Sequence, residues 1–118
     1  MHRRLLILFA ILAPFCALLG CGSGASSARL SNDLKQVGLT YHLYHDDHQV
    51  GPASWDEFID YANKMEPGSD VVFKRVRDAG YNLKWKVKFS EVKEGLSSTV
   101  LGEKPGGGPK LMMDGSVQ

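Results

Sequence analysis

The chain has 118 residues and a nearly balanced charge, with 14 Lys and Arg against 13 Asp and Glu. A hydrophobic fraction of 43% and a charged fraction of 23% are typical of one globular domain, not of a disordered or multi-span membrane protein. The net charge of +1, without a basic block, argues against a nucleic-acid partner. Two cysteines are too few for a disulfide framework or a four-thiolate zinc site. Composition therefore excludes several classes of protein and indicates no activity.

The first 20 residues have the order of a secretory signal peptide. A positively charged start, residues 2–4, is followed by the apolar run Leu5–Leu19. A membrane-spanning helix needs about 20 apolar residues, so this run is short for a permanent span. A charged start followed by a short apolar run is typical of a signal peptide, and we assign residues 1–20 to it.

The end of this segment, Leu18-Leu19-Gly20-Cys21, resembles the bacterial lipobox. In that motif the cysteine is acylated and becomes the first residue of the mature protein, and each buried methylene of the acyl chains adds about 0.8 kcal/mol of membrane affinity. The resemblance implies a protein of the bacterial cell envelope, anchored through lipid on Cys21 and facing the periplasm, with the outer membrane favoured over the inner. An uncleaved or secreted form, with Cys21 as an ordinary thiol, is the alternative.

Residues 21–28 are rich in Gly and Ser and form a predicted tether, and residues 29–118 form the predicted head domain. From residue 30, apolar side chains recur at steps of three and four, which predicts an amphipathic helix. If the stripe extends beyond what a small sheet can cover, it also offers a contact surface to partner proteins. Its members are Leu30, Leu34, Val37, Tyr41 and Tyr44.

Local signals bound this helix and the next. Gly38 lies inside the predicted helix at a cost near 1 kcal/mol, which indicates close packing against another element. Gly51-Pro52 ends the helix, because proline biases the preceding residue to extended geometry. Ser54 and Glu57 then have the spacing of a capping box, which predicts a second helix as far as Met65.

The remaining residues predict a short helix and a sheet. Ser69 and Asp70 resemble a helix start and Gly80 a helix end, although the β-branched residues between them leave a strand open. From Tyr81 to Phe89 apolar residues alternate with polar ones, which predicts a half-buried strand with lysines on its outer face. Further strands are predicted at residues 99–101 and 110–113, with a return after the turn at Asp114-Gly115.

Helices followed by strands predict an α+β fold. We expect a long N-terminal amphipathic helix, one or two short helices, and a small antiparallel sheet of three to four strands.

Several segments together resemble a known family. Ser31–Leu39, continued through Tyr41–Asp46, resembles the start of the head domain in planctomycete pilin-like proteins, and Met113–Val117 resembles their closing Asp-Gly motif. The segments at 54–58, 77–81 and 98–103 resemble small envelope lipoproteins of the same lineage. The resemblance covers about residues 29–117. It implies a type IV pilin or pseudopilin-like head, with envelope or pilin-like proteins as partners and no catalytic residue or cofactor.

The chain departs from that family in two places. Prepilins have a peptidase site followed by a membrane-embedded, polymerising helix, whereas a lipobox and a tether stand in that place here. The larger pilin-like proteins have a histidine ten residues before the Asp-Gly pair, and Lys104 occupies that position in this chain.

The only cluster of metal-ligand residue types lies near the end of the first predicted helix. His42 and Asp46 are four residues apart, so both could reach one ion, whereas His45 lies about 60° from His42 around the helix. A zinc site needs three or four convergent ligands, which this spacing does not supply. We predict no metal and expect these histidines to stabilise the negative end of the helix dipole, with His42, His45 and Asp46 as the candidates if a metal binds.

For the other candidate sites, a structural role explains the residues better than a binding or catalytic role. The glycine run at 106–108 lacks the spacing of a phosphate-binding loop, and no serine has a nucleophile's context. Lys84, Lys86 and Lys88 line one face of a predicted strand, where they could bind an acidic glycan or a lipid headgroup. The leading hypothesis is a non-enzymatic, lipid-anchored envelope protein whose head mediates protein contacts. The alternative is a periplasmic binding module for a metal ion or a polyanionic ligand.

Overall fold

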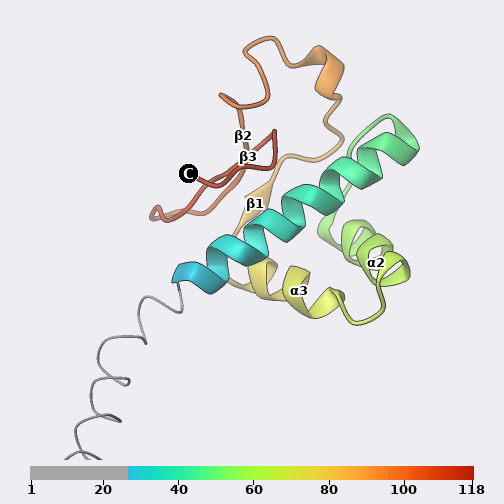
Figure 1. Ribbon diagram of the computed structural model, residues 1–118, viewed down its shortest axis with the longest axis vertical. Helices are drawn as coiled ribbons and strands as arrows, with labels where there is room; N and C mark the ends of the chain where they lie inside the picture. Colours follow the sequence, from blue (N-terminus) through green and yellow to red (C-terminus); the bar gives the residue numbers. More distant parts are fainter. Residues whose placement is uncertain (1–26) are drawn as a thin grey trace, which may run out of the picture.

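The computed structural model describes residues 27–118 (Figure 1). The signal peptide, Cys21 and most of the predicted tether therefore lie outside the described residues. Residues 27–48 are helical and are called the N-terminal helix here; they include residues 27 and 28, which the sequence analysis placed in the tether. Helices α2, Trp55–Met65, and α3, Asp70–Asp78, follow. The predicted second and third helices are both confirmed.

A small antiparallel sheet completes the α+β fold that the sequence predicted. Its strands are β1, Asn82–Leu83, β2, Val100–Glu103, and β3, Leu111–Met112, in the spatial order β1-β2-β3. A short 3-10 helix, η1, covers Phe89–Glu91 between β1 and β2. In Figure 1 the N-terminal helix runs diagonally between the sheet above it and α2 and α3 below it.

The apolar stripe of the N-terminal helix forms the centre of the core. Leu34, Val37 and Tyr41 are fully buried, Tyr44 is 8% exposed, and Leu30 packs against the cluster from its edge. This chain's own sheet and helices cover the stripe, so the side chains that we expected to meet a partner protein are not free to do so. The remaining buried members of the cluster are Phe58, Ile59, Ala62, Phe73, Val76, Tyr81, Leu83, Leu101, Leu111 and Met113.

At Gly38 the N-terminal helix lies close to the C-terminal hairpin. A Cβ atom at this position would lie 2.9 Å from Cδ1 of Leu111 and 3.1 Å from Cα of Gly115. Real side chains do not make such contacts without a shift of the neighbouring atoms. The predicted close packing at Gly38 is confirmed.

Helices α2 and α3 follow their local signals, with one difference. The Ser54 hydroxyl accepts a hydrogen bond from the backbone N–H of Glu57, as a capping residue should. The Glu57 carboxylate, however, accepts a hydrogen bond from the Tyr44 hydroxyl. The Glu57 side chain therefore joins α2 to the N-terminal helix.

The predicted strand over residues 81–89 is wrong in its extent. Ladder pairing with β2 covers Asn82 and Leu83, and the N–H of Lys84 still donates to Leu101. Beyond that point the chain exchanges partners: the N–H of Lys86 donates to the carbonyl of Pro52, and the N–H of Gly51 donates to that of Val87.

The alternation of buried and exposed side chains nevertheless continues to Phe89. A period of two therefore identified the alternating burial correctly, but not the left-handed backbone at Lys86 or the segment with which the chain pairs.

The C-terminal strands are close to prediction. Strand β2 begins at Val100, with an irregularity in its pairing to β3 between Val100 and Gly102. The predicted return after Asp114-Gly115 is confirmed by an isolated bridge between Leu111 and Val117 and by a pair of backbone hydrogen bonds between residues 110 and 118.

A partly buried ion pair that the sequence analysis did not predict joins the N-terminal helix to α3. Nε of Arg75 lies 2.7 Å from Oδ2 of Asp33, and a second guanidinium nitrogen lies 2.9 Å from Oδ1. The Asp33 side chain is 6% exposed and that of Arg75 is 36% exposed. The hydrogen bonds to Asp33 raise the pKa of Arg75 above its usual value. An acid beside the apolar stripe, one residue before Leu34, was the signal for such a pair.

The unequal exposure of the two partners predicts unequal effects of their loss. Arg75→Met leaves a carboxylate buried without its partner and should lower the free energy of unfolding by about 3 kcal/mol. Asp33→Ala leaves an arginine that can reach water and should cost about 1 kcal/mol. Urea unfolding measures both, with Lys74→Ala, which removes an exposed pair with Asp70, as a control within about 0.5 kcal/mol of the wild type. Equal losses for the two variants would contradict this account.

Candidate functional site

His42 and His45, the strongest metal-ligand candidates, both hold the segment around η1 and the C-terminal hairpin. Nε2 of His42 lies 2.5 Å from the carbonyl oxygen of Met113, to which it can donate. Nε2 of His45 accepts a hydrogen bond of 3.1 Å from the backbone N–H of Phe89. Both imidazoles lie against the Phe89 ring, with centroid separations of 4.6 Å and 4.2 Å. These contacts give the two histidines a structural role.

Asp46 and the two residues after it on the same helix, Asp47 and His48, have different neighbours. His48 stacks on Tyr44 at 4.1 Å, and its Nδ1 lies 3.0 Å from the Tyr44 carbonyl. Asp47 accepts a hydrogen bond from the Tyr61 hydroxyl, and Asp46 is exposed. Within residues 27–118, no three His, Cys, Asp or Glu side chains converge closely enough to hold a metal ion.

All four tyrosines of the chain are held in their neutral form. Burial raises the pKa of Tyr41 to about 12, and the hydrogen bond to Glu57 does the same for Tyr44. For Tyr61, burial and then the hydrogen bond to Asp47 raise the pKa to about 12. Burial also raises the pKa of Tyr81, whose hydroxyl donates to the carbonyl of Pro109.

These shifts predict a loss of stability in alkali. A phenol whose pKa is raised by folding binds its proton more tightly in the folded chain, so its contribution is present below about pH 10 and declines as the pH rises towards 12. Tyrosinate absorbance should therefore lag in the folded protein and develop near pH 10 in the urea-unfolded chain. Coincident titration curves for the folded and unfolded chains would contradict the tyrosine contacts described here.

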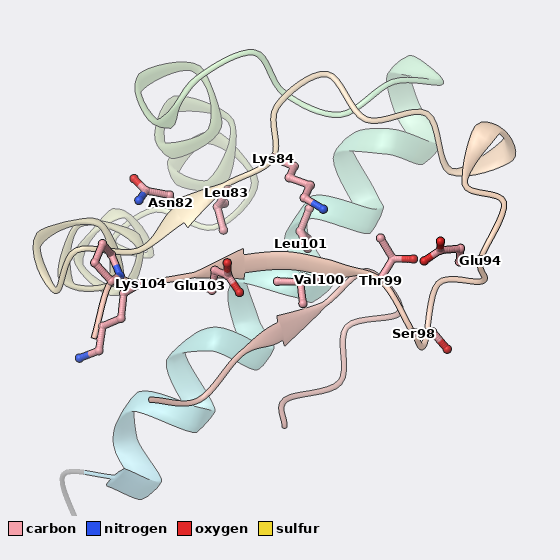
Figure 2. Close-up of a pocket in the computed structure, with 11 residues that line it drawn as sticks. Asn82, Leu83, Lys84, Glu94, Ser98, Thr99, Val100, Leu101, Glu103 and Lys104 are labelled. Carbon is pink, nitrogen blue, oxygen red and sulfur yellow. The ribbon is translucent and has the colours of Figure 1, made fainter. Parts of the chain in front are cut away.

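A depression of about 620 Å³ lies beside β1 and β2 (Figure 2). Figure 2 shows Asn82, Glu103 and Lys104 towards one end and Glu94, Ser98 and Thr99 towards the other. Its two lysines, Lys84 and Lys104, are offset by the two glutamates. The Thr99 hydroxyl donates to the carbonyl of Gly95. This arrangement provides polar contacts but no pairing of a nucleophile with a base.

A second depression is lined in part by exposed apolar side chains and was not predicted. It has a volume of about 380 Å³ and lies between the N-terminal helix, the end of α2 and the start of α3. Leu39, Leu43 and Met65 line it while remaining 64%, 40% and 56% exposed. We call it the Leu39–Leu43 groove. Its other lining residues are Gln36, Thr40, Ala62, Glu66, Ser69 and Phe73.

The sequence signal for this groove was two leucines four residues apart and off the main stripe. Residues at that spacing lie on one face of a helix, so Leu39 and Leu43 form a second, narrower apolar face. An exposed apolar cluster of this kind marks an interaction surface more often than a scattered single residue does.

Comparison with known proteins adds no relative to these observations. The chain matches no protein-family model, and no significant match is found among curated proteins or solved structures. Among the helices that lie within residues 27–118, none combines the length and the apolar character needed to cross a bilayer.

Proposed function

We propose that this chain is a non-enzymatic, lipid-anchored protein of the bacterial cell envelope whose α+β head binds a partner protein. The anchor is the acylated Cys21, and the mature chain faces the periplasm. The head is pseudopilin-like, with a long N-terminal amphipathic helix on a small sheet. The proposal that the head binds a partner protein rests on the Leu39–Leu43 groove.

The groove is suited to a protein partner because its floor is fixed and its exposed apolar side chains lie beside polar ones, Gln36 and Glu66, that can add hydrogen bonds. Phe73 and Ala62, which line it, are 1% and 2% exposed and belong to the core. Leu39, Leu43 and Met65 remain largely in water. Covering such side chains contributes about 25 cal/mol for each Å² of apolar surface removed from water.

The histidine contacts favour a role without catalysis. His45 accepts a backbone hydrogen bond through Nε2, and Nε2 of His42 faces a carbonyl oxygen, so these nitrogens are engaged in holding the fold. A general base needs a nitrogen that faces a substrate proton.

The test of this proposal has two arms, and the first concerns the anchor. Cells that make the full chain are labelled with palmitate, and the protein is recovered from membrane and soluble fractions. The wild type should carry label and sediment with membranes, whereas Cys21→Ser should lose the label and become soluble. Cys16→Ser is the matched control and should behave as the wild type. An unlabelled wild type would overturn the anchor.

The second arm concerns the groove. A photo-crosslinking residue is placed at Leu43 in one variant and, as a control, at Val71 in another. Val71 is an exposed apolar residue, 58% exposed, and does not line the groove. One defined adduct should form from Leu43 and not from Val71, and it should disappear in Leu39→Glu. Leu39→Glu must also keep the wild-type melting temperature. Adducts that form equally from both positions, or that survive Leu39→Glu, would overturn the contact surface.

A further inference from the structure

Charge is segregated along the described chain. Residues 27–78, which contain the three helices, have six basic and nine acidic side chains, a net charge of −3. Residues 79–118, which contain the sheet and its loops, have six basic and four acidic side chains, a net charge of +2. The nearly neutral net charge of residues 27–118 is therefore the sum of a negative helical half and a positive sheet half. Opposite fields of this kind direct charged partners to one part of a surface.

The positive half has its densest charge in the segment that follows β1. Lys84, Lys86 and Lys88 fall within five residues, and each is exposed. Their Cα atoms span at most about 14 Å. We call these three residues the lysine ribbon.

The lysine ribbon differs from the cations of α2 and α3 in its pairing. Lys64, Lys74, Arg75 and Arg77 each lie within 3.0 Å of a carboxylate oxygen. No ion pair is formed by a lysine of the ribbon within residues 27–118. Its ammonium groups are therefore not held in ion pairs, although Lys84 lines the same depression as Glu94 and Glu103.

The backbone of the ribbon is held from both sides. The carbonyl of Lys84 accepts a 2.7 Å hydrogen bond from the Tyr41 hydroxyl, and the N–H of Lys86 donates to Pro52 at 2.8 Å. Between the lysines, Trp85 and Val87 are half-buried against the core. Because the backbone is already ordered, a ligand orders only the lysine side chains when it binds.

The backbone at Lys86 is in the left-handed region, with φ of 55°. Glycine adopts this conformation freely and asparagine with little cost, whereas a lysine there is strained. Strained residues gather at functional sites. Lys86 is therefore a cation at the one position of the ribbon where the backbone conformation favours glycine or asparagine.

From these observations we infer that the lysine ribbon binds a linear polyanion, a polymer with repeated carboxylate or phosphate groups. A flexible linear polymer can follow three exposed cations spaced two residues apart along an ordered backbone. Glu91 and Glu94, which follow the ribbon in the sequence and are exposed, lower the positive charge that a broad anionic membrane surface would meet. The inference does not depend on the groove or on the lipid anchor.

Binding of labelled poly-L-glutamate and of inorganic polyphosphate to the purified full chain tests this inference. The triple variant Lys84→Gln, Lys86→Gln and Lys88→Gln should bind at least one polymer about tenfold more weakly and lose most of the salt dependence. The matched control, Lys35→Gln, Lys64→Gln and Lys74→Gln, removes the same charge from the helical half and should stay within about twofold of the wild type. Lys86→Gly should weaken binding while raising the melting temperature, because glycine relieves the strain.

Three outcomes would overturn the inference. They are an equal loss of affinity in both triple variants, no binding of either polymer by the wild type, and ribbon-dependent binding to phosphatidylglycerol vesicles without polymer binding. Lys86→Gly with unchanged affinity and a raised melting temperature would remove Lys86 from the site. Failure of the polymer test leaves the anchor and groove results unaffected, so the two proposals are judged separately.

Discussion

The buried side chain of Tyr41 connects four parts of the molecule. Its hydroxyl donates to the carbonyl of Lys84, and its ring lies 5.6 Å from that of Phe58 in α2 and 5.9 Å from that of Phe89 in η1. A Cβ atom at Gly51 would collide with the hydroxyl, so glycine at that position allows the loop to approach. A buried hydroxyl without its partner costs about 1–3 kcal/mol, so the position of the Lys84 carbonyl beside Tyr41 is strongly favoured.

Both proposed surfaces follow from this arrangement. The Tyr41 face of the N-terminal helix is occupied by the core, and residues two positions from a buried one lie about 200° around a helix. Leu39 is therefore directed away from the core and towards the Leu39–Leu43 groove. On the other side, the Tyr41 hydroxyl fixes the point at which the lysine ribbon leaves the sheet. One buried side chain thus sets the geometry of an apolar surface and of a cationic one.

The helices could be predicted because their signals are local, as the Ser54 cap of α2 shows. The end of β1 could not, because the pairing of Lys86 with Pro52 depends on how two distant segments are brought together. The same reason explains why the sequence left the contact role of the stripe open: its burial depends on the position of the sheet. For the candidate sites, the sequence identified the lysines and histidines. It did not show that the histidines form hydrogen bonds within the fold whereas the lysines of the ribbon form no ion pairs among the described residues.

The most direct test of the central role of Tyr41 is amide hydrogen exchange in Tyr41→Phe, which removes only the hydroxyl. The account predicts faster exchange at the amides of Gly51 and Lys86, which pair next to the lost hydrogen bond. The amides of Met112 and Gln118, in the C-terminal hairpin, should keep their wild-type protection relative to global unfolding. Unchanged exchange at Gly51 and Lys86, or a uniform increase at all four amides, would contradict it.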